Sequence, residues 1–154
     1  MSGDAQGTRG TFTMTGGSLT YSAADGPLFY VTNSTGVIVL KGVSLGAASG
    51  ILVQVGCRNW GTRGSNGGSV ILKADSQSLS GSLVADKLSS LDISLKDDST
   101  LGGAINPAKA VNLSLDATST WTVGADSCLT ALLDAAGVSG STTTNITGRG
   151  HTVS

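Results

Sequence analysis

A short phrase of alternating apolar and polar residues recurs along this chain and constrains its fold more than any other feature. The segments Leu91 to Leu95 and Val111 to Leu115 place aliphatic side chains at every second position, with Ser, Asn or Asp between them. Such alternation is typical of a β-strand with one buried face. A third segment aligns with these two, and the aligned columns contain Val70, Ile93 and Leu113, followed by Leu72, Leu95 and Leu115.

The column pattern continues on both sides of these segments. A second apolar column contains Leu79, Leu101 and Trp121, and a third contains Leu83, Ile105 and Val123. Upstream, Phe12 and Met14 match Ile38 and Leu40, and Leu19 matches Leu45. Strands this short cannot bury a face alone, but stacked turns of about 20 to 30 residues join the columns into one core.

This repetition predicts an all-β fold, a right-handed parallel β-helix (solenoid) of about five to six irregular coils. We expect residues 1–154 to form a single domain and to be a fragment of a longer repeat-containing protein. A β-sandwich also contains short strands separated by turns, but nothing in that fold requires a two-strand phrase to repeat in register. The repetition therefore favours the solenoid.

Two segments interrupt the repeat. Residues Gly56 to Gly68 insert an extra loop between two strands. Residues 127–136 predict one short helix, because Asp126 or Ser127 could cap its start and the leucines that follow would share one face. A helix there would cover an open end of the solenoid against edge-to-edge pairing.

The composition agrees with a protein of strands and turns. Hydrophobic residues make up 39% of the chain but aromatics only 4%, so aliphatic side chains must fill the core. All 10 acidic residues are Asp, which favours turns, and there is no Glu, which favours helices. The formal net charge of −1 gives no electrostatic basis for binding nucleic acid or an anionic membrane. No stretch is long enough to span a membrane, and residues 1–10 lack the apolar run of a signal peptide.

Cysteine and histidine form no catalytic or metal-binding motif. Cys57 and Cys128 lack the CxxC spacing of zinc and redox sites, and we expect buried thiols rather than a disulfide, although pairing stays open. His151 is the only histidine and has no nucleophile at a recognisable spacing, so we expect it to be exposed. No cofactor is expected.

Four stretches resemble a known class of proteins: Leu28 to Leu45, Asn59 to Asp86, Ser89 to Asn106 and Val111 to Val123. They are similar to the right-handed parallel β-helix repeats of large bacterial cell-surface proteins, of the adhesin-like or autotransporter-passenger-like type. The resemblance covers nearly the whole chain. It implies a secreted structural protein at the cell surface and brings no catalytic motif with it.

The inserted loop is the strongest candidate for a binding site. It concentrates Arg58, Trp60 and Arg63, whereas the strands carry mostly Ser, Thr and Asn. Loops on a rigid scaffold commonly carry binding residues, and Trp with Arg is typical of contact hot spots and sugar-stacking sites. The alternative is that Trp60 folds back over the coil and Arg63 bonds to loop carbonyls.

A row of aspartates is the candidate for metal binding or catalysis. Asp75, Asp97 and Asp98 occupy similar turns in neighbouring repeats and could stack near one another, and Asp116 begins the matching turn of the next repeat. Clustered carboxylates could bind calcium or, in a polysaccharide hydrolase, act as acid and base. Turn chemistry also explains them without any function, because Asp side chains hydrogen-bond to their own turns.

Two hypotheses about function follow. The first is a non-enzymatic structural or adhesive surface module, in which a rigid β-helical stalk presents loops to a glycan or to a host or cell-surface protein. End-to-end self-association of stalks is compatible with it. The second is a carbohydrate-binding or polysaccharide-degrading domain, lyase-like or hydrolase-like, built on a β-helix. Both hypotheses place the protein outside the cell.

Overall fold

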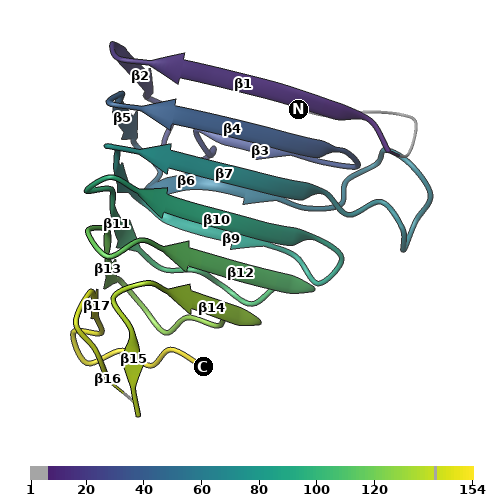
Figure 1. Ribbon diagram of the computed structural model, residues 1–154. Helices are drawn as coiled ribbons and strands as arrows, with labels where there is room; N and C mark the ends of the chain where they lie inside the picture. The colour runs from purple at the N-terminus through teal and green to yellow at the C-terminus, as the bar shows by residue number, and fades with distance from the viewer. Residues whose placement is uncertain (1–6, 141) are drawn as a thin grey trace.

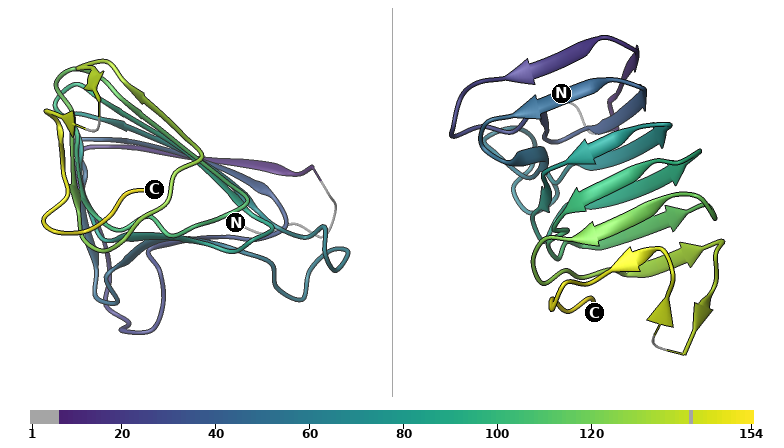
Figure 2. Two further views of the ribbon diagram at one scale, coloured as in Figure 1. Left: turned by 90° about the horizontal axis from the view of Figure 1, so that it is seen from below. Right: turned by 90° about the vertical axis from the view of Figure 1, so that its left-hand side faces the viewer.

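Each turn of the chain adds one strand to a large parallel sheet, and the turns stack into a β-solenoid of about six turns (Figure 1). The computed structural model describes residues 7–140 and 142–154, in which every regular element is a strand. The winding is right-handed, as in nearly all parallel β crossovers (Figures 1 and 2). The predicted all-β parallel solenoid is therefore confirmed. Residues 1–6, in which we expect no export signal, lie outside the described residues.

The large sheet contains one strand from every turn. Its 6 strands lie in the spatial order β1 (Arg9–Thr15), β4 (Thr35–Lys41), β7 (Ser69–Asp75), β10 (Ser90–Lys96), β12 (Ala110–Leu115) and β14 (Ala131–Asp134). All neighbours are parallel, so each strand pairs with its counterpart one turn away. The sheet forms one side of a triangular outline when the solenoid is viewed along its axis (Figure 2).

Two narrower sides complete the triangle. The second side contains β2 (Ser18–Tyr21), β5 (Ser44–Ala47), β8 (Ser78–Ser80), β11 (Thr100–Gly103), β13 (Thr120–Val123) and β17 (Ile146–Thr147). The third side contains β3 (Phe29–Val31), β6 (Ile51–Val55) and β9 (Ser82–Ala85), and a parallel bridge from Leu83 to Ile105 extends it. The last turn also carries an antiparallel hairpin of β15 (Val138–Ser139) and β16 (Thr142–Thr143).

Aliphatic columns fill the interior of the triangle. The central column of the large sheet contains residues that are at most 1% exposed: Ile38, Leu72, Ile93 and Leu113. On the second side, Leu79, Leu101 and Trp121 pair in successive turns and are equally buried. Burying each such side chain stabilises the fold by about 1.5–3 kcal/mol, so the stack of turns is also the source of its stability.

The predicted alignment of β7 with β10 is wrong by two residues. The sequence columns predict Val70 opposite Ile93, whereas the strands pair Val70 with Leu91 and Leu72 with Ile93. The next inward position is filled by Ala74, a small residue that the apolar pattern does not mark. Because side chains alternate with a period of two, a shift of two residues buries the same face, and the pattern cannot detect it.

The other predicted columns agree with the structure, with one exception. The confirmed pairs are Phe12 with Ile38, Met14 with Leu40, Leu19 with Leu45, and Leu95 with Leu115. Val123 is predicted to lie with Ile105 in the third column, but it pairs with Gly103 on the second side. The reason is that β13 continues along the second side as far as Val123, so the chain turns the corner later than the spacing suggests.

The short helix predicted near residues 127–136 is wrong. Ala131–Asp134 form the strand β14, which pairs with β12 and places Leu132 opposite Leu113. Leu132 extends the core column, while Leu133 points to solvent and is 69% exposed. Pairing with the open edge of β12 outweighs helix propensity, which is a weak preference that tertiary context overrides.

One core column ends in a carboxylate. Asp134 pairs with Leu115 and occupies the inward position of the last turn. Its Oδ1 accepts hydrogen bonds from the Ala136 backbone N–H at 3.0 Å and from Asn145 Nδ2 at 2.9 Å. The aliphatic column therefore stops here, because an apolar residue stacked on Asp134 would bury a polar group that needs partners.

Polar side chains at one corner link each turn to the turn before it. Between the large sheet and the second side, the Val43 N–H donates to Gln77 Oε1 at 2.8 Å. The Gln77 N–H donates to Ser99 Oγ at 3.1 Å, and the Ser99 N–H donates to Ser119 Oγ at 3.2 Å. These buried side chains satisfy corner N–H groups that strand pairing does not reach. We call Gln77, Ser99 and Ser119 the corner ladder.

Gly103 permits a close approach at the corner between the second and third sides. A Cβ at this position would collide with the carbonyl oxygen of Gly81 in the preceding turn, so only glycine fits. The Gly103 carbonyl in turn accepts a hydrogen bond from the Trp121 indole Nε1 at 2.9 Å. This bond satisfies the one polar atom of the largest buried side chain.

Replacing Leu95, which is 0% exposed, tests the core column. We expect Leu95→Ala to lower the free energy of unfolding by about 2–5 kcal/mol, because it leaves a cavity between stacked turns. Ser94→Ala, on the outward face of the same strand, should change it by less than about 0.5 kcal/mol. Denaturant unfolding of both variants checks this, and similar losses in the two would contradict the assignment of faces.

Replacing Ser99 tests the corner ladder. Ser99→Ala leaves the buried N–H of Gln77 without its acceptor, and we expect a loss of about 1–3 kcal/mol in the free energy of unfolding. Hydrogen exchange at the Gln77 amide should also become faster. Ser80→Ala, at an exposed position of the same side, is the control. A stability loss without faster exchange at Gln77 would place the effect elsewhere.

Candidate functional site

The inserted loop leaves the solenoid between β6 and β7, at the corner where the third side meets the large sheet. It extends beyond the triangular outline and is the teal loop on the right of Figure 1. We call it the 56–68 loop. A loop can leave a solenoid in this way because the strands before and after it still pair with the neighbouring turns.

Asn66 and Asp86 hold this loop in shape. Asn66 is 5% exposed, and its Nδ2 donates hydrogen bonds to the carbonyl oxygens of Arg58 at 2.7 Å and Trp60 at 3.0 Å. Asp86 lies after β9, one turn further along, and its Oδ2 accepts a hydrogen bond from the Cys57 N–H at 2.6 Å. The loop is therefore fixed both within itself and to the adjacent turn.

The hydrogen bonds to Asp86 keep its carboxylate ionised. Partial burial opposes ionisation, but the Ser89 hydroxyl and the N–H groups of Cys57 and Leu88 donate to the carboxylate and together lower the pKa of Asp86. A hydrogen bond to Asp86, with burial and the carboxylate charge, raises the pKa of the Cys57 thiol. Cys57 is therefore a weak nucleophile at neutral pH.

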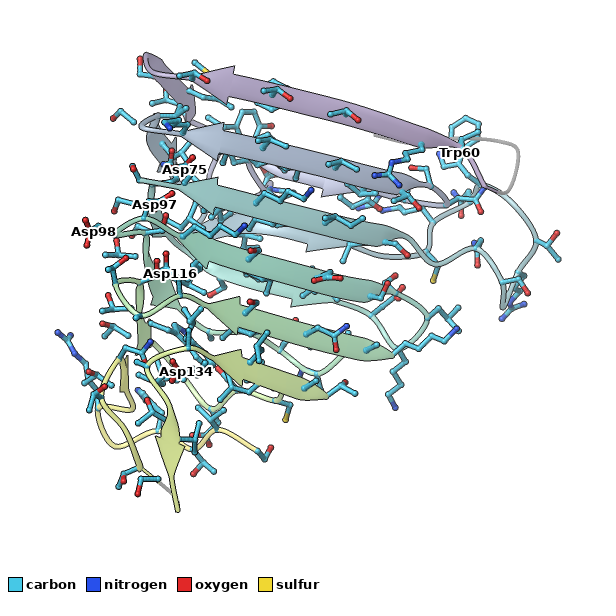
Figure 3. The ribbon with its side chains drawn as sticks, in the orientation of Figure 1. Trp60, Asp75, Asp97, Asp98, Asp116 and Asp134 are labelled. Atoms are coloured by element: carbon cyan, nitrogen blue, oxygen red, sulfur yellow. The ribbon has the colours of Figure 1, made fainter. Side chains whose placement is uncertain are left out.

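A cavity of about 620 Å³ opens against the 56–68 loop, and both Arg58 and Arg63 line it. The other lining residues are Cys57, Asn59, Gly61, Gly64, Asn66 and Leu88. Trp60 lies outside this lining and is 50% exposed; Figure 3 shows its ring near the ends of β1 and β4. Of the three predicted binding residues, the structure thus brings two to one cavity and leaves the third as an exposed aromatic on the same loop.

The two arginines differ in how they are held. The Arg58 guanidinium carbon lies 5.7 Å from the centroid of the Tyr30 ring, within the range of a cation–π contact. Arg63 has no such aromatic partner in the described part of the chain. Neither guanidinium forms an ion pair with a described residue.

The predicted aspartate row runs along the corner between the large sheet and the second side (Figure 3). Its members have partners within the fold. Asp75 forms a salt bridge with Lys41 at 3.2 Å, and chiefly this hydrogen bond lowers the pKa of Asp75. Asp116 Oδ2 accepts a hydrogen bond from the Asp97 N–H at 2.7 Å, which is the main cause of its lowered pKa.

Turn geometry accounts for Asp97 and Asp98. Both have positive φ angles, 52° and 59°, a region that Asp adopts more readily than most residues. The Asp98 N–H donates to Thr118 Oγ1 at 2.9 Å, again in the next turn. In the residues that the structure describes, no group of three or more His, Cys, Asp or Glu side chains could hold a metal ion, so Asp75, Asp97 and Asp98 are not gathered into such a site.

The two thiols and the imidazole differ in their surroundings. Both cysteines are free. The expectation of a buried thiol is wrong for Cys57, which is exposed because it lies in the inserted loop rather than in a stacked strand. Cys128 is partly buried, with its Sγ 3.1 Å from Ser154 Oγ. His151 is exposed as expected, and its Nδ1 lies 3.8 Å from Asp126 Oδ1.

Both ends of the solenoid expose apolar side chains. A hollow of about 300 Å³ at the N-terminal end is lined by Phe12, Leu28 and Phe29, among others. One of about 430 Å³ at the C-terminal end is lined by Leu132, Ile146 and Val153, among others. End-to-end self-association stays a prediction. Its simplest form, in which a second copy continues the stack, would place Met14 against the Asp134 carboxylate.

The residues that shape the loop are missing from the sequence analysis. Asn66 precedes a pair of glycines, which signals a turn, but nothing in the sequence shows that its amide bonds to two loop carbonyls. Asp86 follows a strand of the next repeat and has no sequence signal that links it to the loop. The corner ladder is missed for a similar reason, since its residues are read as ordinary turn residues.

Fold and site together define the class of protein: a parallel β-solenoid with an inserted loop that carries two arginines without an ion-pair partner among the described residues. In comparisons with known proteins, no protein-family model, curated protein or solved structure matches the chain. In its described residues no helix has the length and apolar character of a membrane span.

Replacing Asp116 tests whether the aspartate row stabilises the fold. The folded-state pKa of Asp116 lies below its ordinary value of about 3.9. Its contribution is therefore present above that ordinary value and is lost as the pH falls through the folded-state pKa. We expect Asp116→Asn to melt at a lower temperature than the wild type at pH 7, with the difference shrinking towards pH 2.

Melting curves over this pH range check the prediction. The matched control is Asp92→Asn, an exposed outward position of β10, which should track the wild type at every pH. A difference for Asp116→Asn that stays constant with pH would show that the carboxylate charge is not its cause.

Proposed function

We propose that this chain is a non-enzymatic structural and adhesive module, a β-solenoid stalk that presents the 56–68 loop to a binding partner. One observation carries the proposal: the cavity beside this loop is lined by two arginines without ion-pair partners among the described residues. Stability does not require unpaired cationic side chains around a hollow, whereas recognition uses them.

The scaffold supports the proposal because it is built to hold a loop rigidly. Strand pairing on both sides of the loop and the hydrogen bonds to Asn66 and Asp86 fix its conformation before any partner binds. A pre-ordered loop loses little conformational entropy on binding. The strands themselves present mostly small polar side chains, which offer little contact area.

The alternative, a polysaccharide-degrading enzyme, has less support. Inverting hydrolysis needs one carboxylic acid that stays protonated, which requires a raised pKa. The pKa values of Asp75, Asp86 and Asp116 are instead all lowered by hydrogen bonds from the fold. Carboxylates held in this way stay ionised and are engaged with structural donors.

Location and partner belong to the same proposal. The resemblance to bacterial cell-surface β-helix proteins, together with the Ser-, Thr- and Gly-rich strands and turns, supports an extracellular, surface-exposed module. Its partner would be a glycan or a host or cell-surface protein. Trp60, half exposed on the same loop, supplies the aromatic surface that either partner would contact.

Replacing Trp60 tests the proposal. We expect Trp60→Ala to weaken binding to a glycan or cell-surface protein by tenfold or more, since aromatic hot spots contribute about 2 kcal/mol or more. Its melting temperature should change little, because half of the side chain is already exposed. Glycan and surface-protein arrays probed with wild type and variant measure the effect.

The matched control is Tyr21→Ala, which removes another aromatic of similar exposure (44%) from a different corner. If both variants bind as the wild type does, the loop is not the binding element. The same glycan incubations, analysed for released fragments, address the alternative: cleavage that Asp97→Ala abolishes would contradict the non-enzymatic proposal.

A further inference from the structure

We infer that the cavity of the 56–68 loop binds an acidic saccharide, with the carboxylate or sulfate group of the sugar held between Arg58 and Arg63. This inference rests on the proposed function, because it names the ligand of the same loop.

The cavity beside the 56–68 loop is positively charged. Among the described residues, the lining of the cavity contains two guanidinium groups and no carboxylate. In the part of the chain that the structure describes, neither arginine is paired with an acid. The chain as a whole has a formal net charge of −1, so this local concentration of positive charge is a property of the loop and not of the protein. A site of this kind attracts anions.

The geometry of the two guanidinium groups suits an anion. The Arg58 guanidinium lies over the Tyr30 ring, and no described residue accepts a hydrogen bond from its N–H donors. A guanidinium presents these donors as a planar fork that matches the two or three coplanar oxygens of a carboxylate or sulfate. Two such forks around one cavity can hold an anion from two directions.

Backbone N–H groups of the loop provide further donors for an anion. Within the described residues, the backbone N–H groups of residues 58–64 donate no hydrogen bond, whereas the Ser65 N–H bonds to the Thr62 carbonyl. Gly64 lines the cavity and has open space on its side-chain side, whereas Gly61 also lines it but packs against the Asn33 side chain. Unpaired N–H groups around a concave loop add to the attraction for an anion.

Asp86, which anchors the start of the loop, pairs with neither arginine. It is not among the described residues that line the cavity, and its two oxygens accept hydrogen bonds from Cys57, Leu88 and Ser89. The carboxylate thus orders the start of the loop.

The volume of the cavity and its other polar and aromatic neighbours favour a saccharide over a bare inorganic anion. A volume of about 620 Å³ lies in the range of small-ligand sites, roughly 300–1,000 Å³, and exceeds what one inorganic anion needs. The side-chain amide of Asn59 can bond to hydroxyl groups, and Trp60 offers a half-exposed ring against which a sugar face can pack. An acidic sugar in the cavity uses the arginines and the amide, while the Trp60 ring, which lies outside the lining, is left for a further sugar unit of the same saccharide.

Matched saccharides test the inference by titration calorimetry. One pair is an oligouronate and its carboxyl-reduced neutral counterpart, and the other is a sulfated oligosaccharide and its desulfated counterpart. We expect the acidic member of at least one pair to bind at least about tenfold more tightly than its neutral counterpart. The pair that shows the difference identifies the acidic group, and its binding should weaken with added salt.

Variants assign the effect to the loop. Arg58→Gln combined with Arg63→Gln should reduce binding of the acidic saccharide by at least about tenfold. The control combines Lys96→Gln with Arg149→Gln, which removes the same charge at an exposed position at the far end of β10 and at the C-terminal end of the second side, and should leave the affinity within about twofold. If the double variant loses stability because Arg58 packs on Tyr30, Arg63→Gln alone still has to weaken binding.

The outcomes separate the inference from the proposed function. Equal binding of acidic and neutral saccharides, with a loss in Trp60→Ala, would overturn the acidic ligand and leave the loop as the binding element. Binding of a surface protein alone, again lost in Trp60→Ala, would overturn the saccharide and keep the proposed function. Acid-selective binding that survives the arginine substitutions would overturn the placement of the site.

Discussion

Hydrogen bonding between successive turns is the constraint on which the rest of this structure depends. A parallel strand leaves its N–H and C=O groups unpaired unless a neighbour lies on each side, so no turn is stable alone. The corners pose the harder problem, since the backbone bends there and strand pairing stops. Gln77, Ser99 and Ser119 solve it by accepting hydrogen bonds from the turn before. Ser127 does the same at another corner, where the Ile105 N–H donates to its Oγ at 3.0 Å.

These bonds all run in one direction, from the N–H groups of one turn to the side chains of the next. The polar residues that stabilise a turn are therefore encoded 20 to 34 residues later in the chain. Asp86 follows the same rule when it accepts the Cys57 N–H of the inserted loop. The 56–68 loop is consequently part of the stack energetically, although it lies outside the stack in space. A binding loop anchored in this way keeps its shape without a core of its own.

The apolar columns were predictable because they follow a local alternation of apolar and polar residues. The errors in strand alignment and in the predicted helix fall where this alternation does not decide between structures. Ile93 and Leu113 pair as expected, but β7 is displaced by two residues, since Ala74 is too small to mark an inward position and a two-residue shift preserves the faces. The leucines around residue 132 fit a helix equally well on periodicity. Only the open edge of β12, a tertiary feature, decides for a strand.

In the candidate site too, the sequence predicts which residues could bind a ligand but not how they are arranged. Arg58, Trp60 and Arg63 stand out in the sequence because long cationic and aromatic side chains are rare in this chain. What they do depends on Asn66, whose buried amide bonds to the carbonyls of Arg58 and Trp60 and so sets the curvature of the loop. That bend places the two guanidinium groups around one cavity and leaves the indole outside it. Sequence reasoning can thus name the groups that would contact a ligand, while the geometry that makes them act together comes from a residue that would not touch it.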